Sequence, residues 1–243
     1  MSQNYRLIRH KVVDSTQLEL KNFLERNPQT TDIVAVSAQT QLHGKGRGVS
    51  VWQDEPGYSA LFSVFIRWPK PVQESFLVNK WVCHVLATVM PPTVQYKWPN
   101  DLMVGTKKLG GLLIENRWEG RGIGSSIIGC GVNVLKNPNQ LKRAITLEEM
   151  EVSITVEETI STILEAMHAS VVWIQNEALL ERRYSELLWG RDTFQRYKRL
   201  EDEHSFLAKV RGVNNQGKLV LETQQGDHRS YDLDEIRWES SDS

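Results

Sequence analysis

The segment YKWPNDLMVGTKKLGGLLIENRW, residues 96–118, constrains the fold more than any other part of the chain. It begins as a strand, breaks at Pro99, turns at Gly105 and resumes as an apolar strand. The tetrapeptide EGRG then leads into a further apolar strand over residues 125–134, which is the spacing of a β-hairpin. Strands joined by such short links pair antiparallel, so we expect a mixed or largely antiparallel sheet.

The remaining periodic segments add strands and helices to this sheet. Apolar runs over residues 32–41 and 60–68 predict buried strands. Apolar residues recur with a helical period over residues 73–90 and again from residue 156. A short amphipathic helix is expected after Ser15, because Thr16 and Glu19 have the spacing of a capping box. The fold class is therefore α+β.

The sequence pattern changes near Tyr197, from long periodic segments to short strands divided by turn residues. From there the sequence holds three short strands divided by Asn-Asn-Gln-Gly and Gln-Gly-Asp turns. This pattern is typical of a small β-barrel appended to the larger unit. We expect two domains, residues 1–196 and residues 197–243.

Composition excludes several classes of protein. The 243 residues carry a net charge of −1 with mixed signs, which disfavours nucleic acid or anionic lipid as a partner. No apolar run approaches ~20 residues, and charges interrupt the N-terminus where a signal peptide needs an apolar stretch. Cys83 and Cys130 lie in apolar runs, as reduced core thiols of a cytoplasmic protein do. The six histidines show no ligand spacing, so no protein metal site is expected.

The glycine-rich run Gly44–Gly48 is the first candidate binding element. No helix is predicted after it, so it matches neither a dinucleotide fingerprint nor a nucleotide P-loop. Glycines alone would support only a flexible turn. Lys45 and Arg47 between the glycines favour an anion cradle that closes over a phosphate.

The opening segment is the second and more specific candidate. Asn100 and Asp101 lie at its break, and Lys108 directly precedes Leu109-Gly110-Gly111. These residues could form an ordinary β-turn beside a solvated lysine. However, the glycines allow a ligand to approach the backbone closely, which suits a lysine that holds a carboxylate and the phosphate joined to it. Asn133 ends another glycine-containing strand, IIGCGVNV, and could equally be an exposed amide.

These elements, in this order, resemble the biotin protein ligases over nearly the whole chain. The resemblance rests on four segments, namely VVDSTQ, QLHGKGRG, KWPNDL with KKLGGLLIE, and IGCGVNV. The most specific of them is KWPNDL with KKLGGLLIE. The resemblance implies a mixed sheet with flanking helices, similar to class II aminoacyl-tRNA synthetases, and an SH3-like C-terminal barrel. It implies two steps: biotin and Mg-ATP give biotinyl-5′-AMP, and biotin then passes to a lysine of the carrier domain of a biotin-dependent carboxylase.

The resemblance also assigns roles to particular residues. It implies a biotin-binding set of Ser15, Thr16, Gln17, Gln41, Lys45, Gly46, Arg47, Lys108 and Gly111. It implies a nucleotide-binding set of Lys45, Arg47, Trp52, Asn100, Asp101 and Asn133. Lys108 and Arg47 would act in the chemical step, because two anions must be brought together and cations must offset their repulsion.

The sequence departs from the family pattern in three places. Gln17 stands where asparagine is usual, Lys45 replaces an arginine and so gives a point charge in place of a bidentate fork, and Gly48-Val49 replaces Arg-Gly. We also expect a monofunctional ligase, because the sequence starts at the catalytic domain without room for a DNA-binding module. No DNA or membrane partner is expected, while a homodimer is compatible with the sequence.

Two alternatives stay open. A lipoate or octanoate ligase of the same superfamily would need an apolar tunnel, and the polar side chains of Ser15, Thr16 and Gln41 argue against it. A non-catalytic binding protein could keep the scaffold while its loop decayed. In the C-terminal barrel, Lys209 and Arg211 could face the nucleotide or simply form a solvated strand face.

Overall fold

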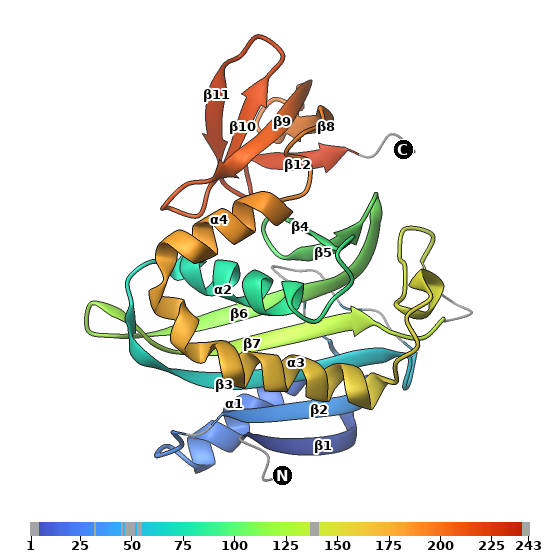
Figure 1. The fold of residues 1–243 in the computed structure, drawn as a ribbon, viewed down its shortest axis with the longest axis vertical. Helices are drawn as coiled ribbons and strands as arrows, with labels where there is room; N and C mark the ends of the chain where they lie inside the picture. Colours follow the sequence, from blue (N-terminus) through green and yellow to red (C-terminus); the bar gives the residue numbers. More distant parts are fainter. Residues whose placement is uncertain are drawn as a thin grey trace.

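The computed structural model describes residues 5–31, 33–44, 46, 52, 55–136 and 141–239. Its larger sheet has seven strands in the order β1-β2-β3-β7-β6-β5-β4 (Figure 1). The strand bounds are β1 Arg6–Val13, β2 Val34–Gln41, β3 Ser59–Val72, β4 Gln95–Lys97, β5 Asp101–Val104, β6 Lys107–Glu119 and β7 Gly122–Asn133.

The pairing confirms the predicted mixed sheet. β1 and β2 are parallel, since helix α1 connects them, and every other neighbouring pair in this sheet is antiparallel. The predicted hairpin joins β6 to β7, with Glu119 opposite Gly122. The break at Pro99, whose peptide bond to Trp98 is cis, separates β4 from β5.

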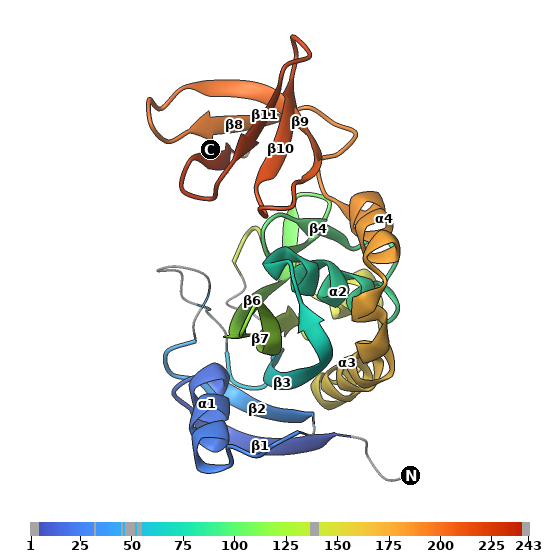
Figure 2. The same ribbon diagram turned by 90° about the vertical axis from the view of Figure 1, so that its left-hand side faces the viewer.

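Helices cover both faces of the large sheet. The bounds are α1 Thr16–Arg26, α2 Ser75–Ala87, η1 Glu148–Met150, α3 Val156–Ser170, η2 Val171–Gln175 and α4 Glu177–Leu187. Helices α2, α3 and α4 lie on one face and α1 lies on the other (Figure 2). Among the described residues, no helix is long and apolar enough to cross a membrane.

The main core lies between the sheet and helices α2 and α3. Trp81 of α2 is fully buried and packs edge-on against Trp68 of β3, with ring centroids 5.1 Å apart. Both indole nitrogens are satisfied: Trp81 donates to the carbonyl oxygen of Ser170, and Trp68 donates to the Ser126 hydroxyl. A rigid, fully bonded layer therefore supports the central strands.

The capping box predicted at the start of α1 is wrong. Ser15 is the N-cap and makes no side-chain capping bond, and the Thr16 hydroxyl turns toward β2 and β3. The structure places a complete capping box at α3, between Thr155 and Glu158. The polar side chains at the start of α1 are thus available for a site.

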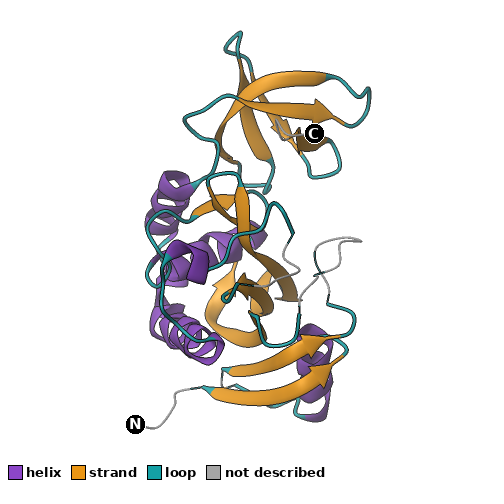
Figure 3. Cartoon of the chain, turned by 90° about the vertical axis from the view of Figure 1, so that its right-hand side faces the viewer, coloured by secondary structure: helices purple, strands orange, loops and turns teal. Residues whose placement is uncertain are grey.

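The C-terminal part forms a second, antiparallel sheet, which confirms an all-β C-terminal unit (Figure 3). Sequence patterns predicted three strands there, and the structure has five in the order β11-β10-β9-β8-β12. Their bounds are β8 Gln195–Arg199, β9 Ser205–Val213, β10 Leu219–Thr223, β11 His228–Tyr231 and β12 Ile236–Glu239. The domain boundary at residue 196 stays a prediction.

Candidate active site

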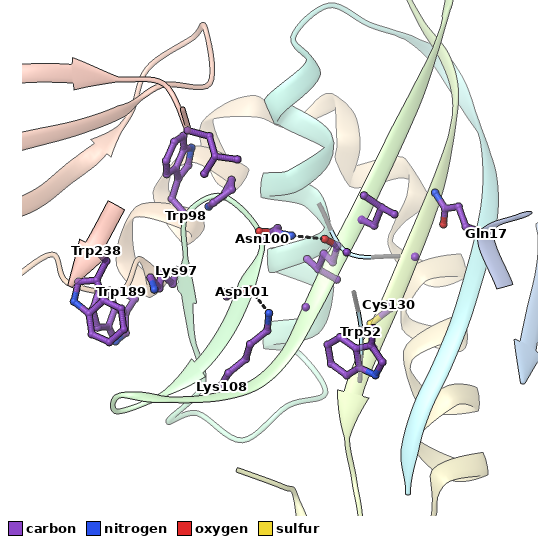
Figure 4. A pocket seen from close by; sticks show the side chains of 18 of the residues that line it. Gln17, Trp52, Lys97, Trp98, Asn100, Asp101, Lys108, Cys130, Trp189 and Trp238 are labelled. Atoms are coloured by element: carbon purple, nitrogen blue, oxygen red, sulfur yellow. Dashed lines mark hydrogen bonds and ion pairs between the residues drawn. The ribbon is translucent and has the colours of Figure 1, made fainter. Parts of the chain in front are cut away.

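A cavity of about 430 Å³ runs from helix α1, across β6 and β7, to the edge of the small sheet (Figure 4). The predicted site residues that line it are Ser15, Thr16, Gln17, Gln41, Gly46, Trp52, Asn100, Asp101, Lys108 and Gly111. Residues from distant parts of the sequence thus meet in one cavity, as the resemblance implied.

One end of the cavity is a buried, uncharged polar cluster. Oε1 of Gln41 accepts from the backbone N–H of Thr16 at 2.8 Å and from the Thr16 hydroxyl at 3.1 Å. The Thr16 and Ser63 hydroxyl oxygens are 2.9 Å apart, and Ser63 Oγ lies 3.0 Å from Oε1 of Gln17. Ser15 completes the cluster and is 1% exposed. Hydroxyl and amide groups in this setting suit a neutral ligand that both donates and accepts hydrogen bonds.

Gln17 is anchored on both sides of its amide. Its Nε2 donates to Oε2 of Glu115 at 3.0 Å, and Glu115 forms an ion pair with Lys21 at 2.6 Å. Gln17 was predicted as a departure from the family asparagine, and the longer side chain reaches this carboxylate on β6. Ser63 and Glu115 were not predicted as site residues. The one sequence signal for Ser63 is a hydroxyl that interrupts the apolar run ALFSVFIRW.

Glycines on β7 make room for the cavity. A Cβ atom at Gly129 would lie 2.7 Å from Oε1 of Gln17. A Cβ atom at Gly131 would lie 3.0 Å from the indole ring of Trp52. Real Cβ contacts are rarely so short, so a larger residue at either position would displace the Gln17 amide or the Trp52 ring. The space predicted beside IIGCGVNV is therefore real and is bounded by an aromatic ring.

Lys108 and Asp101 form an ion pair at the centre of the cavity. Lys108 Nζ lies 2.6 Å from Oδ1 of Asp101 and 5.8 Å from the centre of the Trp52 ring. Figure 4 shows both side chains pointing into the cavity between Trp52 and the small sheet. The pair is reachable, since the Lys108 side chain is 42% exposed. A cation held at this point can receive an anionic ligand.

Asn100 fixes the turn that carries this pair. Its Nδ2 donates to the carbonyl oxygen of Leu112 at 2.7 Å, and the backbone N–H of Leu112 donates to the carbonyl oxygen of Asn100 at 2.9 Å. These two bonds continue the β5–β6 pairing past Gly111, and they fix the position of Asp101.

Asn133 does not line the cavity. Its Nδ2 donates to the carbonyl oxygens of Lys108 and Ile145, at 3.3 and 3.2 Å. The backbone N–H of Lys108 donates to the carbonyl oxygen of Arg143 at 2.7 Å. Asn133 therefore holds the backbone of Lys108, a role that the sequence did not suggest.

Lys97 is a cavity residue that sequence reasoning did not assign. Its Nζ lies 4.0 Å from the ring centre of Trp238 and 5.5 Å from that of Trp189. Burial lowers the pKa of Lys97 to about 8, against the opposing effect of the Asp101 charge. The KWPND block gave a signal for this residue, but its aromatic partners come from distant parts of the chain, Trp189 after α4 and Trp238 in β12.

Of the two alternatives for Lys209 and Arg211, the structure favours a strand face outside the cavity. Lys209 and Arg211 both pair with Glu222, with Lys209 Nζ 3.1 Å from its carboxylate, and neither lines the cavity. Arg237 and Trp238 of β12 line it in their place. Lys45 and Arg47 lie outside the described residues.

Cys130 also lines the cavity, in an environment that disfavours the thiolate form. Complete burial raises the pKa of Cys130 to about 12, so its thiol is neutral near pH 7. Among the described residues, no group of three or more His, Cys, Asp or Glu side chains could hold a metal ion.

Comparison with known proteins identifies the family. The family model described as the biotin/lipoate A/B protein ligase family matches residues 10–133, more than half of the chain. The chain belongs to this family. The matched region includes the polar cluster, the Lys108–Asp101 pair and the β7 glycines, so the cavity is built mostly from the family's shared part.

Individual relatives are similar over longer stretches. The bifunctional ligase/repressor BirA of Bacillus subtilis is 28% identical over 247 residues, which cover 94% of this chain and 73% of the relative. The biotin--[acetyl-CoA-carboxylase] ligase of Paracoccus denitrificans is 28% identical over 133 residues, covering 52% of this chain and 53% of the relative.

Solved structures of biotin protein ligases share the fold. The Aquifex aeolicus enzyme in complex with biotin and ATP superposes with a TM-score of 0.73 at 23% identity, over 97% of this chain and 99% of that one. The Leishmania major enzyme in complex with biotinyl-5-AMP gives a TM-score of 0.56 at 19% identity, over 96% of this chain and all of the other. At these identities the likeness confirms the predicted fold class.

Proposed function

We propose that this protein is a biotin protein ligase, which activates biotin with ATP and transfers it to a lysine of a carrier domain. The observation that carries the proposal is the composition of the cavity between α1, β6, β7 and the small sheet. An uncharged polar cluster around Thr16, Gln41 and Ser63 lies at one end, and the Lys108–Asp101 pair lies at its centre. The cluster suits the ureido ring of biotin, and Lys108 suits its carboxylate.

In the first step two anions must meet. The biotin carboxylate oxygen attacks the α-phosphorus of Mg-ATP, an O–P bond forms, and the bond to pyrophosphate breaks. Lys97, Lys108 and Arg237 line the cavity and offset the repulsion between these anions. Mg²⁺ enters as part of the substrate, since it binds phosphate oxygens together with one or two carboxylates, and Asp101 is the carboxylate in reach.

In the second step the acceptor's lysine amine attacks the carbonyl carbon of biotinyl-5′-AMP. A C–N bond forms, the C–O bond to the phosphate breaks, and AMP leaves with the electron pair. Lys108 stabilises the charge that develops on the carboxyl and phosphate oxygens in both steps. Its position supports this role, because Asn133 and Asp101 hold its backbone and its ammonium group.

The remaining residue roles are part of the proposal. Ser15, Thr16 and Gln41 would bind the ureido group, and Trp52 and Asp101 would contact the nucleotide. Asn100 would position Asp101, and Asn133 would act through the Lys108 backbone and not by touching the base. The proposed contacts of Lys45, Gly46 and Arg47 with carboxylate and phosphate rest on the sequence resemblance.

Biotin-dependent exchange of pyrophosphate into ATP tests the proposal. The chain should catalyse exchange with biotin, and lipoate or octanoate should support at least tenfold less, because a fatty chain leaves the buried hydroxyls and amides unpaired. Exchange that is faster with lipoate would favour the related ligase. Binding of biotin without any exchange would favour the non-catalytic alternative.

The proposed acceptor is the biotin carboxyl carrier domain of a biotin-dependent carboxylase. We propose no DNA partner, since the net charge of −1 gives no field that would attract the phosphate backbone. A gel-shift assay with the DNA upstream of the protein's own gene, with biotin and ATP present, would reveal sequence-specific binding if this is wrong.

A further inference from the structure

A second cavity lies beside the first. It measures about 300 Å³ and is bounded by the start of α2, by β6 and by two loops of the small sheet. Its polar lining comes from different elements: Asn79 from α2, Asn116 from β6, and Gln216 and Asp232 from the small-sheet loops. It therefore exists only because the two sheets are held together.

One shared layer of residues borders both cavities. Both cavities are lined by the same five residues, namely Trp98, Asn100, Leu112, Leu113 and Leu233. Asn100 is part of this layer and directly precedes Asp101, which pairs with Lys108. A side chain that enters the second cavity would thus lie against the layer that carries Asn100, next to the Lys108–Asp101 pair.

The two cavities differ in charge. Three cations, Lys97, Lys108 and Arg237, line the first one, against the single carboxylate of Asp101. Among the described residues that line the second cavity, Asp232 is the one ionised side chain, and Lys218 pairs with it at 2.6 Å. The first cavity therefore attracts anions, and the second does not repel a cation.

Two amides in the second cavity are oriented to accept. Asn79 Nδ2 donates to the carbonyl oxygen of Pro99 at 3.3 Å, and Asn100 Nδ2 donates to that of Leu112 at 2.7 Å. With both nitrogens used on the backbone, the Oδ1 atoms are left as acceptors, and no donor among the described residues contacts them. A primary ammonium group has three donors and no acceptor, so it matches this lining.

We propose that the second cavity admits the acceptor's lysine side chain, while the nucleotide occupies the first. This inference rests on the proposed function. During transfer the AMP group still fills the first cavity, which the three cations line. The amine therefore needs a separate approach to the carbonyl carbon. Asn79 and Asn100 would receive the ammonium group. The group then loses a proton to solvent, its nitrogen attacks the carbonyl carbon, and the second proton leaves with the departing AMP or to water.

Two substitutions at Asn79 test this route. Asn79→Leu keeps the size but removes the acceptor, and it should lower kcat/KM for the carrier domain about ten- to a hundredfold, as expected for a lost hydrogen bond to a charged group. Asn79→Asp keeps an acceptor and adds a charge, so transfer should stay within about threefold of the unsubstituted protein or improve. Both variants lose the Asn79 Nδ2 bond to the carbonyl oxygen of Pro99, which lines the first cavity. Any effect of that bond on biotin-dependent pyrophosphate exchange should therefore be equal in the two variants, while their transfer rates should differ.

Two substitutions in the loop after β11 add a second test and its matched control. Asp232→Asn should lower kcat/KM for the carrier domain, whereas Asp234→Asn, an exposed change in the same loop but outside the cavity lining, should not. If the two Asn79 variants lose transfer equally, if exchange falls in parallel with transfer across the two variants, or if transfer is unaffected in Asn79→Leu, the route is wrong. Absence of exchange in the unsubstituted protein would refute the proposed function itself, which is a separate result.

Discussion

At the scale of single residues, Lys108 carries the most direct prediction. Lys108→Ala should slow biotinyl-5′-AMP formation roughly a hundred- to a thousandfold, because losing one preorganised donor at a developing charge costs ~3–4 kcal/mol. Lys107→Ala is a matched control, since Lys107 is the exposed neighbour on the same strand and does not line the cavity. Single-turnover measurement of adenylate formation decides the matter, and a rate within a few-fold of the unsubstituted protein would exclude Lys108 from the chemical step.

Lys97 gives a prediction about pH. Burial lowers its pKa from 10.5 in the unfolded chain to about 8 in the folded protein. Between these values the unfolded chain binds more protons, so stability should rise with pH from about 8 to about 10 relative to Lys97→Met, and Lys97 should contribute no pH dependence below that window. Urea unfolding at several pH values measures the difference. A constant difference in unfolding free energy between Lys97→Met and the unsubstituted protein at all pH values would contradict the assignment.

The site could be predicted from the sequence where its parts are close in the chain. Asn100, Asp101 and Lys108 flank one tight turn, so their meeting follows from local strand and turn patterns. Ser63 and Trp238 could not be found in this way, because their contacts with Thr16 and Lys97 depend on strand order and on the packing of two sheets.

At the scale of elements, two adjacent glycines of β6 differ in what a Cβ atom would meet at each position. A Cβ atom at Gly110 would lie 2.5 Å from the carbonyl oxygen of Gly131, which is backbone and cannot move aside. Gly110→Ala should therefore destabilise the fold by about 1–3 kcal/mol. A Cβ atom at Gly111 would meet Lys108 Nζ at 3.4 Å, an ordinary contact. Gly111→Ala should leave stability unchanged but reduce pyrophosphate exchange. Thermal unfolding and exchange assays on both variants test this, and equal losses of stability would contradict it.

Element prediction succeeded where periodicity and turn residues agreed. The β6–β7 hairpin and the stop of α2 before Pro91 follow from such local signals. The capping box at Thr16 failed because a tertiary partner, the Ser63 hydroxyl, competes for the Thr16 side chain. In the small sheet, the polar segment QRYKR of β8 has no clear apolar alternation, so its role as a central strand is visible only from its pairing with β9 and β12.

At the scale of the whole molecule, residues 96–98 of the large sheet contact the small sheet and the connection that leads into it. Trp98 Nε1 donates to the carbonyl oxygen of Gly217 at 2.9 Å, Lys97 lies against Trp238, and the backbone N–H of Trp189 donates to the carbonyl oxygen of Tyr96 at 3.0 Å. This segment leads directly into the turn that carries Asp101. The small sheet is therefore in a position to influence the Lys108–Asp101 part of the cavity, the proposed nucleotide side, more than the polar cluster, which α1, β2 and β3 build.

Trp98→Phe tests this coupling, because it removes the indole hydrogen bond to Gly217 while keeping an aromatic ring. We expect stability to fall by about 1 kcal/mol, the typical net value of one hydrogen bond. ATP affinity should fall about fivefold, while biotin affinity should be unchanged. Trp68→Phe is the matched control, since it removes the indole hydrogen bond to the Ser126 hydroxyl, also 2.9 Å, within the large sheet. It should cost similar stability without altering either affinity. Calorimetric titration with each ligand measures both, and an unchanged ATP affinity in Trp98→Phe would show that the small sheet does not act on the cavity through this bond.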